Sequence, residues 1–267
     1  MHFDELLATA KQFATDESTT VTLPDDWGQG RTAFGGVSAA LLYTAIQSKV
    51  AAGRPLRSLS TNFIGPLALN EPFSFQVDIL REGKSATQVV GKILQHGQIA
   101  VMQQACFGVD RESNIIVDTT TSHTLPSPEG LKTFPFIPSI TPNFIQHTDL
   151  ATCGGNTPFT GSTDSFTDGW MRFKQPPASI NDAHLIALID AWPPCVLQMM
   201  KQPSPASTMT WNLEFIHPHQ PVAPTDWFAY KAVTRQAAGG YAHTEANIWD
   251  AQGELVAISR QCVAVFD

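Results

Sequence analysis

The sequence is poor in cysteine and has none of the cysteine spacings that build metal centres or disulfide frameworks. Its four cysteines are far apart and form no C-x-x-C pair; they are Cys106, Cys153, Cys195 and Cys262. Zinc sites and small disulfide scaffolds rely on closely spaced or paired cysteines. We therefore expect a reduced, cytoplasmic protein with no metal site and no cofactor.

Clusters of positive charge are also lacking. The 267 residues include 16 Lys and Arg against 24 Asp and Glu, which gives a formal net charge of -8. No basic run occurs, so neither nucleic acid nor an anionic membrane is expected as a partner. A phosphorylated small molecule is still a ligand compatible with a chain of this charge, because binding it needs only one or two cationic side chains.

Long hydrophobic runs are missing as well. No stretch approaches the length of a transmembrane helix, and the start of the chain is acidic, without the basic and apolar segments of a secretory signal. Hydrophobic residues nevertheless make up 43% of the chain, enough for a globular protein with a substantial core.

The first part of the chain predicts an α+β unit. Residues 3–14 have the pattern of a short amphipathic helix, and Gly35 and Gly36 open a helix of small residues that runs to about residue 51. Runs typical of strands follow, with Gly97 as a hairpin turn between the last two. These runs are residues 56–64, 72–82, 86–96 and 98–108.

The second part of the chain repeats the first. The motif N-F-I-G-P at 62–66 is answered by E-F-I-H-P at 214–218, and Gly97 by Gly253. A proline-rich stretch, 109–142, separates the two parts. The sequence therefore predicts a tandem duplication, with one unit at 1–108, a linker at 109–142 and a second unit at 143–267.

An acid interrupts an otherwise apolar stretch in the second unit. Residues 185–198 read L-I-A-L-I-D-A-W-P-P-C-V-L-Q and predict a buried helix that contains Asp190. A buried carboxylate must find donors, shift its pKa or hold a water. Pro193 has no N–H for the carbonyl of Ile189, which would loosen the helix beside the acid. The alternative is a structural Asp that caps neighbouring backbone. In the alignment of the two units, Asp190 falls opposite Gly36.

These motifs, in this order and spacing, resemble those of acyl-CoA thioesterases of the TesB-like, double hot-dog family, over nearly the whole chain. The first unit contributes G-R-T-A-F-G-G-V, N-F-I-G-P and L-R-E-G-K-S-A-T. The second contributes L-I-D-A-W-P-P, T-M-T-W-N-L-E-F-I-H-P and D-A-Q-G-E-L-V-A-I-S-R-Q. The resemblance implies two tandem antiparallel sheets, each wrapped around a long helix, and hydrolysis of acyl-CoA to a fatty acid and CoA.

The resemblance also implies which residues hold the hydrolytic water. The family's Asp, hydroxyl and Gln correspond to Asp190, Thr208 and Gln261, although Thr210 lies on the same strand face as Thr208 and is an alternative. A carboxylate can accept the proton of a water that a hydroxyl and a carboxamide hold in place. Gly35 and Gly36 are candidate backbone donors to the thioester oxygen, because N–H groups at a helix start stabilise developing negative charge.

Other aromatic and histidine residues have expected places outside this trio. Trp170 and Trp192 are expected in the core, and His217 and His219 in a solvated turn. A hot-dog hydratase or dehydratase acting on acyl-CoA would need a His beside the acid, and the nearest in sequence, His184, is out of helical phase with Asp190. A non-catalytic acyl-CoA-binding protein is the other alternative. By analogy with the family, a homo-oligomer of two or more chains is expected.

Overall fold

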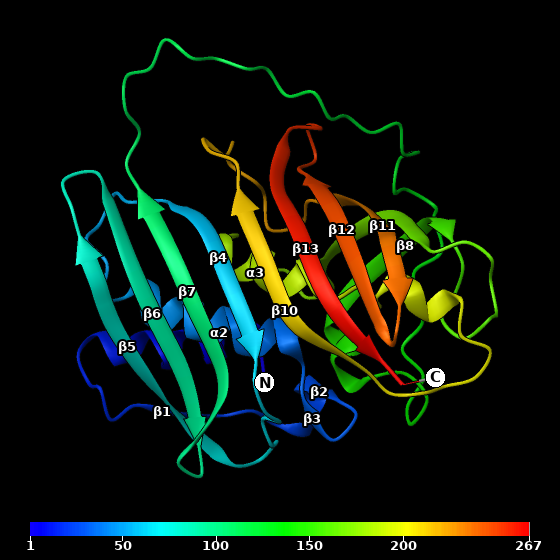
Figure 1. Cartoon of the computed structure of the whole chain (residues 1–267), viewed down its shortest axis with the longest axis horizontal. Coiled ribbons are helices and arrows are strands. Elements are labelled where there is room, and N and C mark those ends of the chain that lie inside the picture. The colour runs from blue at the N-terminus through cyan, green and yellow to red at the C-terminus, as the bar shows by residue number, and fades with distance from the viewer. Residues whose placement is uncertain (267) are drawn as a thin grey trace.

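The computed structural model describes residues 1–266, which form one antiparallel sheet curved around two central helices (Figure 1). In sheet order the strands are β1 (Thr20–Thr22), β5 (Pro72–Glu82), β6 (Ala86–Gln95), β7 (Gln98–Gly108), β4 (Leu56–Phe63), β10 (Ala206–Phe215), β13 (Leu255–Val265), β12 (Tyr241–Trp249), β11 (Phe228–Ala238), β9 (Phe166–Phe173) and β8 (Thr148–Gly155). Two further short strands, β2 (Gly28–Gln29) and β3 (Thr32–Ala33), form a separate hairpin.

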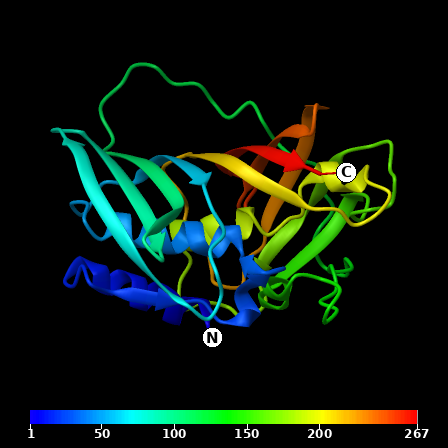
Figure 2. The same ribbon diagram turned by 60° about the horizontal axis from the view of Figure 1, so that its bottom comes forward.

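The helices lie on the concave side of this sheet. They are α1 (Phe3–Lys11), α2 (Gly35–Gln47) and α3 (Asp182–Ile189), with short 3-10 turns η1 (Gln12–Ala14), η2 (Asp25–Trp27), η3 (Asn143–His147) and η4 (Cys195–Gln198). Figure 2 shows α1 on the side of α2 that faces away from the sheet. Because sheet covers α2 on one side and α1 on the other, this helix is apolar almost all round.

The two halves of the sheet repeat one arrangement. Strands β5-β6-β7-β4 of the first half are matched by β11-β12-β13-β10 of the second, and each set follows a central helix. The sets meet where β4 pairs antiparallel with β10, with Leu59 opposite Leu213. The expected fold of two tandem helix-wrapped antiparallel sheets is confirmed, and the two sheets join edge to edge.

Alternating burial positions the sheet on the helices. In β6, every second residue from Thr87 to Gln95 is buried against the helix layer, as a strand with one covered face requires. Gly91 lies so close to α2 that an added Cβ would come within 2.7 Å of Ile46. The small residue therefore allows the helix and the sheet to approach.

The predicted helix over residues 185–198 is wrong in its limits. Helix α3 begins earlier, where the Asn181 side chain accepts hydrogen bonds from the backbone N–H groups of Ala183 and His184, and it ends at Ile189. Asp190 is the C-terminal cap, and Pro193 and Pro194 separate it from η4. Proline cannot donate to the helix and restricts the residue before it, so the helix stops before the acid.

The stretch between the halves contains no helix or regular strand up to η3, and Figure 1 shows its first part arching over the sheet. Its later part packs on the second half. The Trp170 and Trp249 indoles donate to the carbonyls of Pro126 and Thr121, at 2.9 and 3.2 Å, and the Phe134 N–H donates to Leu150. The division of the chain at residues 108 and 143 stays a prediction.

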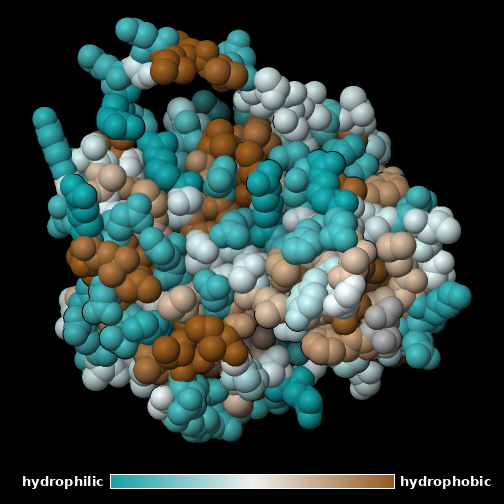
Figure 3. Space-filling view, viewed as in Figure 1, coloured by the Kyte–Doolittle hydropathy of each residue, from teal (hydrophilic) through white to brown (hydrophobic). Residues whose placement is uncertain are grey.

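The face of the sheet away from the helices carries mainly polar side chains, with separate apolar patches between them (Figure 3). Exposed apolar residues on its strands include Leu80, Met209 and Tyr241. Within residues 1–266, no helix has both the length and the apolar character needed to cross a membrane.

Candidate active site

A cavity of about 590 Å³ lies where the two halves meet. Its wall combines the start of α2, the loop after β4, the segment after α3, the start of β10 and parts of the 126–160 region. The polar side chains in the wall are Gln29, Thr32, Ser38, Asp190, Ser207 and Thr208. The large apolar ones include Phe63, Phe134, Phe144, Phe159, Trp192 and Leu197. The cavity therefore suits a small molecule with an apolar part, and it carries one carboxylate.

Asp190 reaches this cavity from the end of α3, beside the start of α2. The Gln261 side-chain amide donates to Asp190 Oδ1 at 3.1 Å, and the backbone N–H of Gly36 also donates to the carboxylate. Oδ2 lies so near α2 that a Cβ on Gly35 would come within 2.8 Å of it. Glycine at the helix start is thus what allows the acid to approach.

The surroundings of Asp190 raise the pKa of its carboxyl from 3.8 to about 7. Burial is the main cause, because it disfavours the charged form. The hydrogen bonds from Gln261 and Gly36 oppose that effect without cancelling it. At neutral pH the group is therefore poised between its acid and base forms, as a proton-transfer catalyst requires.

The other two residues of the predicted trio lie on paired strands. Thr208 of β10 donates its hydroxyl hydrogen bond to Gln261 Oε1 at 3.3 Å, so Thr208, Gln261 and Asp190 form one chain of hydrogen bonds. The pairing of β10 with β13 is irregular between Thr208 and Thr210. Thr208 lines the cavity, whereas Thr210 and part of Gln261 line a separate groove beside Arg235. Thr208, and not Thr210, thus lines the cavity that contains the acid and is linked to the acid through Gln261.

The two glycines of the predicted site have different surroundings. Gly35 lines the cavity. The N–H of Gly36 is directed to Asp190, so it supports the acid instead of facing a substrate oxygen. A Cβ on Gly36 would come within 2.8 Å of the carbonyl of Ala187. Gly36 therefore also allows α2 and α3 to pack closely.

Sequence reasoning missed most of the apolar wall. Trp192, which was expected in the core, is buried but borders the cavity, and Phe134 reaches it from the predicted linker. Both also border a second chamber of about 280 Å³, which Lys132 lines as well. The aromatic residues within the proline-rich stretch were the available signal, because a solvated linker has no need of them. Trp170, in contrast, is buried with Trp249 away from this cavity, as expected.

The histidine nearest to Asp190 in sequence is occupied elsewhere. His184 is buried at the other end of α3, and its Nε2 lies 2.9 Å from Asp4 Oδ1. Among residues 1–266, the side chains that line the cavity include no histidine. No imidazole therefore lies beside the acid in the described lining of the cavity.

Comparison with known proteins gives the same fold and family. The family model "Acyl-CoA thioesterase N-terminal domain" matches residues 23–108, and "Acyl-CoA thioesterase C-terminal domain" matches residues 126–265. No match was found among curated proteins.

Solved structures resemble the chain over almost its whole length. A conserved protein of unknown function with a hot dog fold from Alicyclobacillus acidocaldarius is 24% identical, with a TM-score of 0.81 over 97% of this chain and 98% of that one. The tesB protein of Mycobacterium avium subspecies paratuberculosis is 18% identical, with a TM-score of 0.77 over 100% of both chains. An acyl-CoA thioesterase II from Mycobacterium marinum is also 18% identical, with a TM-score of 0.70 over 99% and 98%. At these identities the likeness establishes the double hot-dog fold. Because the C-terminal domain model alone matches more than half of the chain, the protein belongs to the acyl-CoA thioesterase family.

Proposed function

We propose that the protein hydrolyses acyl-CoA thioesters in the cavity between its two halves, with Asp190 as general base and with Thr208 and Gln261 as its partners. One observation carries the proposal. A carboxylate whose pKa is raised to about 7 lines an apolar cavity and is held by Gln261 and the start of α2. Such a group can accept a proton from water at neutral pH.

The geometry suggests how a water would be held. The amide N–H of Gln261 donates a hydrogen bond to Asp190 Oδ1, and its amide oxygen accepts one from the Thr208 hydroxyl. Gly36 also donates to the Asp190 carboxylate, whose remaining lone pairs, with those of Thr208 Oγ1, are the acceptors for the two hydrogens of one water. The amide of Gln261 orients both acceptors, and this orientation lowers the entropic cost of positioning the water.

The reaction then needs no covalent enzyme intermediate. The water oxygen attacks the thioester carbonyl carbon as Asp190 takes a proton, and the tetrahedral intermediate collapses with cleavage of the carbon–sulfur bond. The proton on Asp190 passes to the departing sulfur, which releases a carboxylic acid and CoA. Gly35, at the start of α2, is the proposed backbone donor to the carbonyl oxygen.

The competing activities predict different results. A hydratase or dehydratase would use an imidazole for proton transfer, and the described lining of the cavity supplies none. A non-catalytic binder would keep the cavity without turnover. The purified protein should be incubated with acyl-CoAs from acetyl-CoA to palmitoyl-CoA while free thiol is followed, and with an enoyl-CoA while loss of the conjugated double bond is followed. Thiol release supports the proposal, whereas hydration alone, or binding without either reaction, would overturn it.

A further inference from the structure

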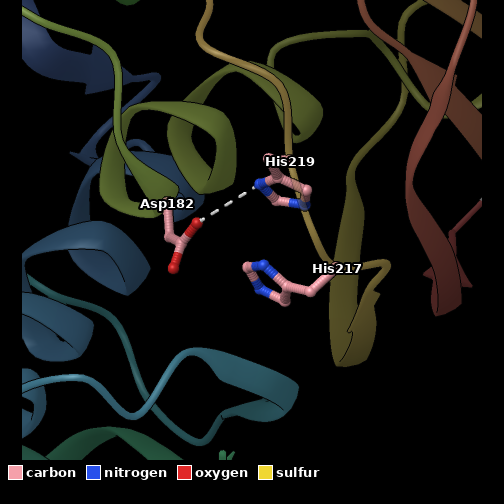
Figure 4. Close-up of side chains that lie close together, drawn as sticks. All are labelled: Asp182, His217 and His219. Atoms are coloured by element: carbon pink, nitrogen blue, oxygen red, sulfur yellow. Dashed lines mark ion pairs between the residues drawn. The ribbon is translucent and has the colours of Figure 1, made fainter. Parts of the chain in front are cut away.

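A second group of polar side chains lies at the opposite end of α3 from Asp190. Asp182 is the first residue of this helix, and His217 and His219 follow β10 on either side of Pro218 (Figure 4). One ligand atom from each of the three lies within 4.8 Å of the other two. His219 Nδ1 is 3.9 Å from Asp182 Oδ1, and the two imidazole rings stack with their centres 4.2 Å apart.

The two histidines, which were expected in a solvated turn, are partly exposed, and a ring nitrogen of each also contacts a backbone carbonyl. His217 Nε2 lies 2.8 Å from the carbonyl oxygen of Leu56, and His219 Nε2 lies 3.2 Å from that of Val256. Because a carbonyl can only accept, each Nε2 carries the hydrogen, and each Nδ1 keeps its lone pair. Metal-binding histidines are typically held in this way, with the second ring nitrogen donating to a backbone carbonyl.

The carboxylate of Asp182 accepts only one hydrogen bond from the described residues. The Tyr43 hydroxyl donates to its Oδ2 at 3.0 Å, and among residues 1–266 no other hydrogen bond reaches this side chain. Its exposed fraction is only 17%. A carboxylate that is mostly removed from water and has one donor is stabilised by a cation.

The internal duplication places this group at the counterpart of the active site. Helices α2 and α3 begin 147 residues apart, at 35 and 182, and the same interval relates Tyr43 to Asp190. Asp190 contacts the start of α2, and Tyr43 contacts the start of α3. The sequence alignment, which set Asp190 opposite Gly36, is therefore wrong for the helices.

The strands show the same correspondence. Thr208 lies seven residues before Phe215, and Leu56 lies seven residues before Phe63. Thr208 belongs to the active site, and the Leu56 carbonyl is the partner of His217. The loop that lines the cavity after β4 has Gly65 where the loop after β10 has His217, in the matching motifs N-F-I-G-P and E-F-I-H-P. The two positions are related by the internal repeat. One holds the proposed catalytic acid, Asp190, and the other holds two imidazoles and the carboxylate of Asp182.

We propose that Asp182, His217 and His219 bind one divalent transition-metal ion, represented by Zn²⁺, which ties the start of α3 to the loop after β10. Two imidazole nitrogens and one carboxylate oxygen suit such ions, whereas Mg²⁺ and Ca²⁺ prefer oxygen ligands alone. Zinc is bound at about 2.0–2.2 Å by these ligands. The three ligand atoms already lie within 4.8 Å of one another, so a small movement of these side chains would close them around the ion, and water would complete the coordination from the exposed side.

The first test is metal binding by the full-length protein after dialysis against EDTA. Titration with ZnCl₂, followed by calorimetry and by metal analysis of the desalted protein, should give one ion per chain. Because the ion binds the folded state, thermal unfolding at a hundredfold excess over Kd should shift upward by roughly 5 °C. No saturable binding of Zn²⁺ or Co²⁺ would overturn the proposal.

Variants locate the site. Asp182→Asn, which can keep the contact with Tyr43, and His219→Gln should abolish the zinc-dependent shift. His243→Gln, a matched change of an exposed histidine on β12, should retain it. If all three variants lost the zinc-dependent shift equally, or if the first two kept it, the ion would bind elsewhere. If the first two variants do not fold, the Co²⁺ absorption spectrum of the parent decides, since a spectrum identical to aqueous Co²⁺ contradicts imidazole ligation.

Discussion

Gln261 Nε2 lies 3.1 Å from Asp190 Oδ1, so β13, an inner strand of the sheet, is hydrogen-bonded to the end of α3. The carbonyl oxygen of the same amide accepts from Thr208. Gln261 therefore bridges the other two residues of the proposed site. A single amide thus connects β13 to α3 and to β10.

Replacing the acid gives the most direct prediction. Asp190→Asn keeps the shape of the side chain but removes the base, so kcat should fall by about two to four orders of magnitude while KM changes only a few-fold. Steady-state kinetics with the best acyl-CoA substrate would measure this. Asp164→Asn, in an exposed loop, serves as the control. A folded Asp190→Asn protein with parental kcat would make Asp190 a structural acid.

The choice between the two threonines can be tested by a matched pair of substitutions. Thr208→Val removes the hydroxyl that reaches Gln261 and the cavity, so we expect kcat to fall by at least tenfold, or about 1.4 kcal/mol in activation free energy. Thr210→Val changes a side chain on the separate groove and should leave kcat within a few-fold. The reverse order of effects would assign the hydroxyl to Thr210.

Local sequence patterns were enough to predict the main strands of the first half, the start of α2 and the place of the acid beside a second apolar helix. Alternating apolar residues define β6, and the acid stands out because the residues before it are apolar. The end of α3 was misplaced because the pattern continues beyond Ile189, and only the combined effect of Pro193 and Pro194 stops the helix.

The surroundings of the cavity and of the Asp182, His217 and His219 group could not be predicted, since they depend on contacts between distant segments. Tyr43 and Asp182 are separated by 139 residues, and His217 and Leu56 by 161. The pairing of β4 with β10 that joins the halves is equally distant. Such contacts follow from how the two repeats face one another, which no local pattern records.

The pH dependence of turnover should report the raised pKa of Asp190. A general base works only when deprotonated, so kcat/KM should be low in acid, reach half its maximum near pH 7 and level off above it. The rising limb should have unit slope on logarithmic axes. Residual activity of Asp190→Asn should lack this limb. A parent profile that is already flat from pH 5 upward would show that no group with this pKa controls the reaction.

The assembly of the chain is a further prediction. The sheet ends at β1 on one side and at β8 on the other. Edge strands leave backbone groups unpaired and are commonly covered by another element or chain. We therefore expect a homo-oligomer of two or more chains, which analogy with the family also favours. Light scattering at micromolar concentration would measure its mass, and the mass of one chain would contradict the prediction.

The raised pKa of Asp190 also predicts how stability depends on pH. Since the folded protein binds this proton more tightly than the unfolded chain, the group lowers the free energy of unfolding as the pH rises from about 4 through 7. A difference of roughly three pKa units corresponds to at most about 4 kcal/mol. Asp190→Asn removes this cost, so it should be more stable than the parent at pH 8 and about equally stable at pH 4.

Denaturant unfolding of both proteins across this range would measure the difference. Asp164→Asn controls for the general effect of losing one negative charge, because its carboxylate is exposed. The contrary result is an Asp190→Asn protein that is less stable than the parent at pH 8. That result would mean that the ionised carboxylate of the parent gains more from its hydrogen bonds with Gln261 and Gly36 than it loses by burial. The pKa would then lie below its usual value, and Asp190 would be too weak a base for the proposed reaction.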